Sequence, residues 1–218
     1  MISIQKQFLF IHVPKTGGNS IQGLLKNYSE DDIVKLANHQ DGVERFEVRN
    51  KRYNIEKHST LSNYKSELDA NTYQSLFKFA TIRNPWDMVI SFYFSPHRGV
   101  KKWNRNDFIS LVDNISPLRY YICLKQVLED ASPKFGADRF NMLIGLDHDI
   151  DFMVRFEHLD HDFQVICKKI GIPFAPLVKR NTSTRAHYSH YYDDELKELV
   201  RAKFFEEIKF GNYNFEND

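Results

Sequence analysis

Short apolar runs alternate with helix-like patterns of apolar positions along this chain. Residues 8–13 are apolar and aromatic except for His12, and Pro14 follows them, so this run predicts a buried strand. Residues 15–20 form a polar segment with a pair of glycines, which predicts a tight loop. The apolar stripe of a helix follows the loop, at Ile21, Leu24, Leu25 and Tyr28.

The same order of elements recurs further along the chain. Residues 77–82 predict a second strand, which Arg83 follows. Asn84 is a preferred N-cap residue and Pro85 suits the first helical position, so a helix is expected to begin there. Residues 151–156 predict a third strand.

Two further helices are indicated nearer the C-terminus. One has Asp160 as its expected N-cap and Gly171 at its end, and its apolar face is formed by Phe163, Ile166, Cys167 and Ile170. The other is expected to run from about 193 to 210, because acidic residues open the pattern and Gly211 follows it. Residues 95–106 show no period and carry several basic side chains, which predicts a surface loop.

Strands that alternate with helices favour a parallel sheet covered on both faces. We therefore expect an α/β fold of three layers, with a central, mostly parallel sheet flanked by helices. A length of 218 residues without an internal repeat or a low-complexity linker predicts a single domain over residues 1–218.

Composition narrows the choice of partners. The chain has 30 basic and 29 acidic side chains and a net charge of +1, which argues against a nucleic-acid coat or a polybasic membrane binder but leaves room for a local basic pocket. The apolar run 8–13 is too short for a membrane span or a signal segment. We expect a soluble, cytoplasmic protein without a nucleic-acid partner or membrane insertion; these patterns do not determine its oligomeric state.

The cysteines and acidic residues do not predict a metal or a disulfide framework. Cys123 and Cys167 form no CxxC pair and have no zinc-site spacing, and apolar residues flank each of them. We expect both to be buried, reduced thiols. No acidic cluster indicates a metal site, and none is expected.

The loop at 15–20 has the composition of an anion site. A loop between a strand and a helix places free backbone N–H groups at the positive end of the helix. Gly17 and Gly18 allow close approach of the backbone, and Lys15 adds a positive charge. Further hydrogen-bond donors come from Thr16, Asn19 and Ser20. For the glycine pair alone, an ordinary strand–helix turn with a surface lysine is the alternative.

This loop differs from the nucleotide-binding Walker A element. That element requires GxxxxGK[ST], in which the lysine follows the glycines and a hydroxyl holds Mg²⁺. Here Lys15 precedes the glycines, and GK[ST] occurs nowhere in the chain. An enzyme that hydrolyses ATP or GTP with a P-loop is therefore disfavoured.

Two motifs carry a resemblance to a known family. Residues 14–20 (PKTGGNS) resemble the 5′-phosphosulfate loop of sulfotransferases that use 3′-phosphoadenosine 5′-phosphosulfate (PAPS). Residues 83–91 (RNPWDMVIS) resemble the 3′-phosphate motif of that family, RNPxxxxxS, and the order and setting of the two motifs agree with it. Weaker similarity to the carbohydrate (Golgi-type) branch and its bacterial relatives lies at residues 155–157, 181–185 and 210–215.

The resemblance, which spans most of residues 8–215, implies the P-loop-like sulfotransferase fold, PAPS as donor, PAP (the desulfated cofactor) as product and no required metal. The implied acceptor bears a hydroxyl and is a carbohydrate. The implied cofactor contacts are Lys15, Thr16, Gly17, Gly18, Asn19, Ser20, Arg83, Ser91 and Arg185. One departure is Met88, where family members often carry arginine.

Sulfuryl transfer depends mainly on positioning and on stabilisation of charge. We expect Lys15 to neutralise the charge that develops on the departing phosphate. We expect His58 to act as general base toward the acceptor hydroxyl, since its ordinary pKa lies near neutrality and the resemblance places a histidine upstream of the second motif. The other candidate bases are His12, His97 and Glu157, of which Glu157 is expected to pair with Arg155 or another basic residue.

Several positions have two interpretations. Ser91 caps the 3′-phosphate or is a small helix-packing residue, and Trp86 stacks on adenine or belongs to the core. Arg185, in a basic cluster with Lys179 and Arg180, contacts the cofactor or is solvated. A second basic group either meets an anionic glycan or forms a plain surface loop, and consists of Arg98, Lys101, Lys102 and Arg105.

Two other functional classes remain as alternatives to a PAPS-dependent sulfotransferase. A nucleotide-dependent phosphotransferase would need Mg²⁺ and a Walker lysine. A non-catalytic module that binds a nucleotide or a glycan would bind PAP without sulfating any acceptor.

Overall fold

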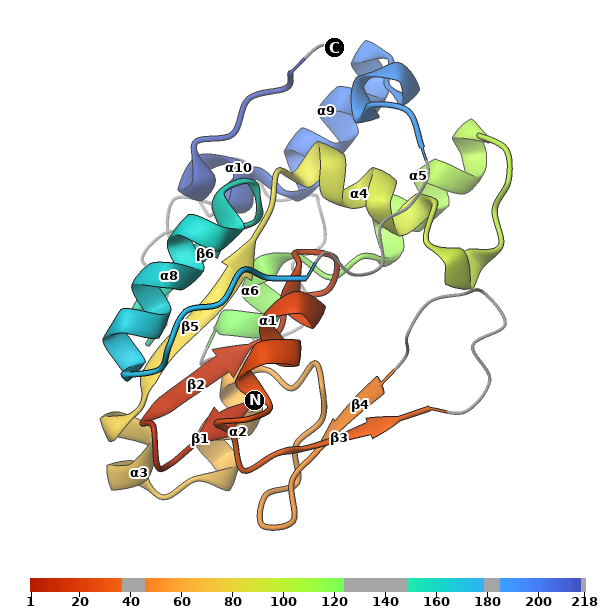
Figure 1. Ribbon diagram of the computed structural model, residues 1–218. Coiled ribbons are helices and arrows are strands. Elements are labelled where there is room, and N and C mark those ends of the chain that lie inside the picture. Colours follow the sequence, from red (N-terminus) through yellow and green to blue (C-terminus); the bar gives the residue numbers. More distant parts are fainter. Residues whose placement is uncertain (37–45, 124–148, 179–184, 217–218) are drawn as a thin grey trace.

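The computed structural model describes residues 1–36, 46–123, 149–178 and 185–216 (Figure 1). The described strands are β1 (Ile2–Ser3), β2 (Phe8–Ile11), β3 (Asp32–Lys35), β4 (Phe46–Arg49), β5 (Phe77–Ile82) and β6 (Phe152–Arg155). The described α-helices are α1 (Gly18–Leu25), α2 (Leu61–Glu67), α3 (Ala70–Ser75), α4 (Pro85–Tyr93), α5 (Arg105–Asn114), α6 (Leu118–Ile122), α8 (Leu159–Ile170), α9 (Asp194–Lys203) and α10 (Phe205–Gly211). Short 3₁₀ turns are η1 (Pro96–Arg98), η2 (Phe156–His158) and η3 (Tyr188–Tyr191).

The main sheet brings the ends of the predicted strands to one edge. Its described strands lie in the order β1-β2-β5-β6, in which β2, β5 and β6 are parallel and β1 pairs antiparallel with β2. Ile11 lies opposite Ala80, and Ile82 lies opposite Arg155. The segments that follow β2, β5 and β6 therefore leave the sheet at the same edge, where α/β proteins bind ligands.

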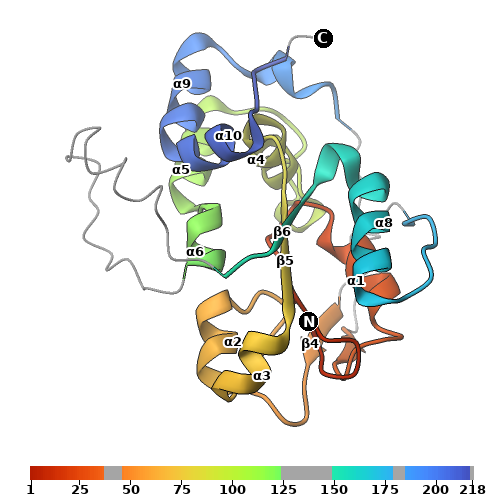
Figure 2. The ribbon, with the colours of Figure 1, turned by 90° about the vertical axis from the view of Figure 1, so that its left-hand side faces the viewer.

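Alternating residues of the strands supply two separate core layers. Leu9 and Ile11 of β2 pack with α2, α3 and α6, whereas Phe8 and Phe10 pack with α1 and α8. Figure 2 shows these two groups of helices on opposite sides of the sheet. The expected three-layer α/β architecture, with a mostly parallel central sheet and helices on both faces, is confirmed.

A third apolar cluster lies beyond the strand ends, among α4, α5, α9 and α10. Trp86 is almost fully buried there, and its Nε1 donates to the main-chain oxygen of Lys197 at 3.0 Å. Of its two interpretations, Trp86 therefore fits that of a core residue. Met88 is also buried in this cluster, where it is an apolar packing residue.

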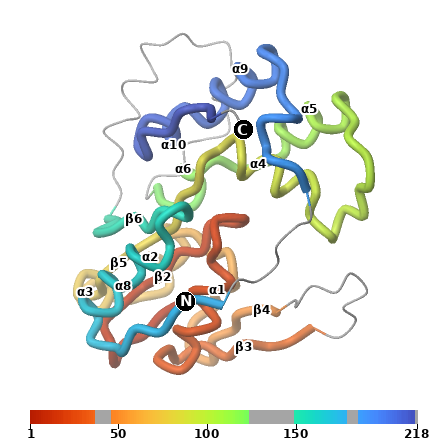
Figure 3. Tube along the Cα trace, turned by 45° about the horizontal axis from the view of Figure 1, so that its top comes forward, coloured from red at the N-terminus to blue at the C-terminus, as the bar shows by residue number. Residues whose placement is uncertain are grey.

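The β3–β4 hairpin forms a separate two-stranded sheet and extends away from the end that carries α9 and α10 (Figure 3). Neither this hairpin nor β1 is predicted from the apolar runs. Among the described residues, no helix is both long and apolar enough to cross a lipid bilayer. The prediction of a single domain over residues 1–218 stays a prediction.

Two predicted helices differ from the observed ones at their boundaries. Asp160 is not an N-cap, because η2 leads directly into α8 at His158 and the Asp160 carboxylate instead accepts from the N–H of Leu177 at 3.0 Å. The helix expected over 193–210 is divided at Phe204, whose backbone ends α9 and opens α10. Phe204 is fully buried, and no glycine or proline marks this break in the sequence.

The ends of two further elements also differ slightly from the predicted ones. β2 ends at Ile11, two residues before the end of the apolar run, and α1 ends at Leu25, before Tyr28. Residues 95–106 are mainly loop, as expected, with η1 inside the segment and α5 beginning near its end.

Candidate active site

A cleft of about 830 Å³ lies at this edge of the sheet, and the segments after β2 and β5 both line it. From the first segment it receives His12, Pro14, Lys15, Gly17, Gly18, Asn19 and Ser20. From α4 and the segments around it come Arg83, Asp87, Ser91, Phe92, Ser95, His97 and Arg98. The remaining lining residues are Lys57, His58, Phe156, Arg185, Ala186 and His187. The glycine loop and Arg83 thus face one shared cleft.

The two glycines of the loop are required for different reasons. Gly17 has φ +86, in the left-handed region that favours glycine. Gly18 opens α1, and a Cβ atom there would lie 2.1 Å from Cδ2 of the His12 ring. Lys15 also has a left-handed backbone, with φ 64, which costs a non-glycine residue about 1–2 kcal/mol. The loop therefore has an unusual backbone that the surrounding contacts must maintain.

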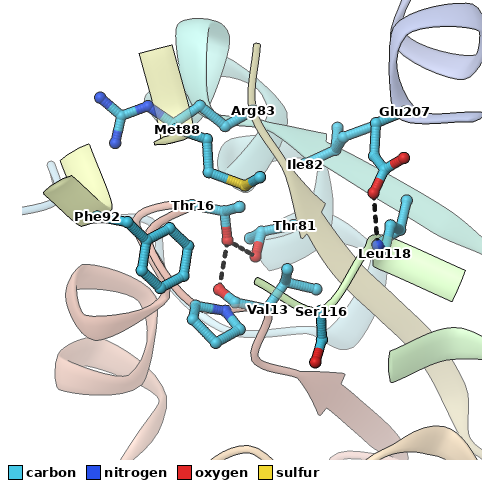
Figure 4. A pocket seen from close by; sticks show the side chains of 11 residues that line it. Val13, Thr16, Thr81, Ile82, Arg83, Met88, Phe92, Ser116, Leu118 and Glu207 are labelled. Atoms are coloured by element: carbon cyan, nitrogen blue, oxygen red, sulfur yellow. Dashed lines mark hydrogen bonds between the residues drawn. The ribbon is translucent and has the colours of Figure 1, made fainter. Parts of the chain in front are cut away.

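Thr16 does not face the cleft. Its hydroxyl donates to the main-chain oxygen of Val13 at 2.6 Å and bonds the hydroxyl of Thr81 (Figure 4). The side chain is almost fully buried and ties the loop to β5. The Thr16 hydroxyl is therefore used inside the protein, and the prediction that Thr16 contacts the cofactor stays a prediction.

The start of α1 keeps hydrogen-bonding capacity for an anion. Gly17, at the N-cap, has no side chain to cap the first N–H groups of the helix. The oxygen atoms of the next two side chains do not add to this capacity as they stand. The Ser20 hydroxyl donates its proton to the main-chain oxygen of Val178 at 2.7 Å, and the buried Asn19 Oδ1, which has no hydrogen-bond partner among the described residues, is an acceptor that cannot bind an anion. Both side chains line the cleft.

Lys15 lies inside the cleft rather than on the surface. Its Nζ is 3.4 Å from the Ser95 hydroxyl. Burial, together with the positive charges of Arg83 and Arg185, lowers the pKa of Lys15 to about 8. Lys15 is therefore still mostly protonated at neutral pH.

Arg83 joins the two motifs. Its Nη1 donates to the main-chain oxygen of Lys15 at 2.8 Å, so it supports the left-handed residue of the loop. Its Nε donates to Asp87 at 2.8 Å, Nη2 contacts the same carboxylate oxygen, and the guanidinium lies 3.8 Å from the centre of the Phe156 ring. Burial lowers the pKa of Arg83, and Asp87 partly offsets this effect.

Asp87 also pairs with Arg185. Burial opposes ionisation of this carboxyl, but the two arginines hold its pKa below the ordinary value. The ion pair between Arg83 and Asp87 was not predicted from the sequence; the spacing of four residues between them is the signal that could have revealed it. Ser91, two turns along α4 from Arg83, is buried and lines the same cleft.

His58 faces the cleft with a defined ring orientation. Its Nδ1 lies 3.0 Å from the main-chain oxygen of His12, so Nδ1–H donates there and Nε2 carries the free lone pair. Burial lowers the pKa of His58, the bond to His12 opposes this shift, and Lys57 adds to it. His12 packs beside it with ring centres 4.5 Å apart, and burial keeps the pKa of His12 well below its ordinary value.

The other candidate bases occupy different places. Glu157 does not pair with Arg155, because Arg155 binds Asp162 through both its side chain and its N–H. Glu157 instead accepts from the N–H of Asn84 at 2.7 Å and from the Tyr213 hydroxyl at 3.0 Å, so it still shapes the start of α4. His97 lines the cleft.

The basic residues that either meet a glycan or form a plain surface loop are partly used within the protein. Arg98 pairs with Asp107 at 2.7 Å, and Arg105 pairs with Asp193 and Glu195. Lys101 and Lys102 are exposed. Lys179 and Arg180 lie outside the described residues.

The cleft has a strongly cationic wall. Among its described lining residues, Asp87 is the only carboxylate, and the lysines and arginines are Lys15, Lys57, Arg83, Arg98 and Arg185. Such a donor set, together with uncapped helix N–H groups, suits a ligand with several phosphate or sulfate groups. The model of the sulfotransferase family matches residues 1–214.

The chain belongs to the sulfotransferase family. Sulfotransferases carry out sulfuryl transfer in general, which involves a nucleotide donor and an acceptor substrate. Comparisons with curated proteins and with solved structures gave no match. In the described part of this sulfotransferase, no group of three or more His, Cys, Asp or Glu residues is arranged to hold a metal ion.

Proposed function

We propose that this chain transfers a sulfuryl group from PAPS to a hydroxyl group of an acceptor, with a carbohydrate as the acceptor class. The observation that carries the proposal is the bond from Arg83 Nη1 to the main-chain oxygen of Lys15. It holds the 3′-phosphate motif against the 5′-phosphosulfate loop, on the wall of one cleft. A nucleotide with phosphates at both ends of its ribose needs two anion sites arranged in this way.

The cleft fits PAPS by the chemistry of its donors. Main-chain N–H groups at the start of α1 and the ammonium of Lys15 suit the phosphosulfate end, while Arg83 and Ser91 suit the 3′-phosphate. When bound, PAPS supplies an activated sulfuryl group. Lys15 stabilises the negative charge that develops on the departing phosphate, because it is protonated and partly removed from water.

His58 takes the proton of the acceptor hydroxyl. Its lowered pKa keeps the ring neutral at pH 7, and the bond from Nδ1–H to the His12 carbonyl places the basic lone pair on Nε2. The proton is then held at Nε2 while the acceptor oxygen attacks sulfur. His12 is a weaker candidate, since it is almost fully buried and harder to protonate than His58.

The proposed carbohydrate acceptor rests on the similarity of residues 155–157 and 210–215 to the carbohydrate branch. These segments support the site, because the Glu157 carboxylate accepts one hydrogen bond from the N–H of Asn84 at the start of α4 and another from the Tyr213 hydroxyl. The cleft volume leaves room for a sugar beside a nucleotide.

A binding titration with PAP and with Mg-ATP, followed by an acceptor screen with ³⁵S-labelled PAPS, tests the proposal. PAP is expected to bind more tightly than ATP and to raise the melting temperature, since a ligand selective for the folded state stabilises it. Labelled sulfate is expected to appear on a carbohydrate hydroxyl and to persist in EDTA. Tighter ATP binding with EDTA-sensitive transfer would favour a phosphotransferase, and PAP binding without any sulfation would favour a binding module.

A further inference from the structure

One carboxylate lies within the cationic wall of the cleft. Asp87 occupies the first turn of α4, where one of its oxygens contacts Arg83 and the other contacts Arg185. The three side chains are mostly buried, with 21% of Asp87, 10% of Arg83 and 11% of Arg185 exposed. Asp87 therefore bridges two arginines that come from distant parts of the chain.

The bridge leaves part of Arg83 available to a ligand. A guanidinium carries five N–H groups. Two of those of Arg83 point to Asp87, and one donates to the main-chain oxygen of Lys15. Two N–H groups thus remain for a ligand, while stacking against Phe156 restricts rotation of the plane.

The bridge also holds Arg185 at the cleft. Arg185, Ala186 and His187 form one part of the cleft lining, and Arg185 reaches α4 through Asp87. Two buried guanidinium groups repel each other. Burial is the main cause of the lowered pKa values of Arg83 and Lys15, and the positive charge of Arg185 adds to both shifts. Without a shared anion, bringing both arginines together would be part of the free-energy cost of binding a ligand.

We propose that Asp87 is a positioning residue, which holds Arg83 and Arg185 together as a preformed site for the 3′-phosphate of the nucleotide. This inference rests on the proposed function, because it concerns the same cleft and the same donor. The inference goes beyond the proposed function because it assigns a binding role to a residue whose charge has the same sign as that of the ligand.

The direction in which ligand affinity changes when Asp87 is neutralised separates this positioning role from simple charge repulsion. If Asp87 only opposed the phosphate, its neutralisation would tighten binding, because the cleft would become more positive. If Asp87 organises the arginines, its neutralisation weakens binding, and only for ligands that have a 3′-phosphate. The ratio of PAP affinity to AMP affinity isolates this contribution, since AMP keeps the 5′-phosphate and lacks the 3′-phosphate.

The experiment measures PAP and AMP binding by calorimetry for the full chain and for Asp87→Asn, which preserves shape and removes charge. We expect the PAP-to-AMP affinity ratio to fall about tenfold, with AMP affinity nearly unchanged. Asp87→Glu, which keeps the charge on a longer side chain, is expected to give an intermediate ratio. AMP binding verifies that each variant is folded.

Asp107→Asn is the matched control, because Asp107 pairs with Arg98, another arginine of the cleft lining. It removes the same charge and is expected to leave the ratio unchanged. The positioning role of Asp87 would be overturned, with the proposed function left intact, by either of two results. One is a PAP-to-AMP affinity ratio that is unchanged or raised in Asp87→Asn, and the other is a ratio that falls equally in Asp107→Asn. A wild-type protein that binds PAP no better than AMP would overturn the proposed function as well.

Discussion

The two sides of the cleft are built in different ways. On the donor side, the loop after β2 and the residues after β5 are joined by many contacts, including Arg83 to Lys15, Asp87 to both arginines and Thr16 to Thr81. On the other side, His58 lies in a turn before α2 and is oriented by one bond to the His12 carbonyl and by its ring contact with His12.

This difference predicts that nucleotide binding and the chemical step depend on different residues. In the proposed function, the donor side is a preorganised anion site, and its individual residues contribute to nucleotide affinity. His58 lies outside that network and has its pKa set by its own surroundings. Substitutions on the two sides should therefore change different kinetic parameters, and the following predictions, from the largest effect to the smallest, test whether they do.

The largest expected effect is a loss of turnover in His58→Ala. Removal of a general base typically costs 10²–10⁴-fold, so kcat should fall about a thousandfold while the Kd of PAP changes less than about twofold. Stopped assays with labelled PAPS and calorimetry with PAP measure the two quantities. The matched control is His97→Ala, on the same cleft, which should keep most activity. An active His58→Ala would move the search for the base to His97 or Glu157.

Lys15→Ala tests the donor side at its charged centre. Loss of one group that stabilises transition-state charge costs about 10²–10³-fold in kcat, whereas PAP affinity should fall by about tenfold or less. Lys168→Ala, at an exposed lysine of α8 outside the cleft lining, serves as control and should behave as wild type. Equal losses in kcat and PAP affinity would mean that Lys15 only binds the donor.

Gly18→Ala tests the contact between the two sides. The added Cβ would meet the His12 ring at 2.1 Å, so either the ring or the loop must shift. Overpacking of this kind costs about 1–3 kcal/mol of stability, and here it should weaken PAP binding and lower kcat together. Thermal unfolding and calorimetry measure the effect. An unchanged melting temperature and unchanged kinetics would show that the contact between His12 and Gly18 has no role.

The pH dependence of kcat/KM gives the smallest effect, a change of about tenfold per pH unit on the acidic and on the alkaline side of the profile. In the proposed mechanism, activity needs neutral His58, whose pKa is lowered from 6.5, so kcat/KM should fall only below that pH. It also needs protonated Lys15, so kcat/KM should fall above about pH 8. Lys15→Arg should move the alkaline limb upward, since guanidinium stays protonated. A limb that remains at pH 8 in this variant would belong to another group.

The strand ends were predictable because local patterns mark them. An apolar run, a helix-breaking residue and a capping residue identify the ends of β2 and β5, and parallel strands bring such ends to one edge. The resemblance implied that Lys15 and Arg83 contact one cofactor, and the structure shows the two residues in contact. The strand within 151–156 followed from the same kind of run.

The contacts that orient the side chains were not predictable in this way. Thr16 turns inward because Thr81, 65 positions later in the chain, offers a partner for its hydroxyl. Asp87 and Arg185 are 98 positions apart, and no local pattern relates them. The β3–β4 hairpin lacks a long apolar run, since only alternate residues of β4 are buried. The sequence thus indicates which residues reach the cleft better than it indicates how they are held there.

A crystal structure of the protein grown with PAP tests the central claim most directly. The account predicts the 5′-phosphate on the main-chain N–H groups of residues 17–19 beside Lys15, and the 3′-phosphate within hydrogen-bond distance of Arg83 and Ser91. A PAP molecule that contacts only one of these two groups, or that lies outside the cleft, would contradict it.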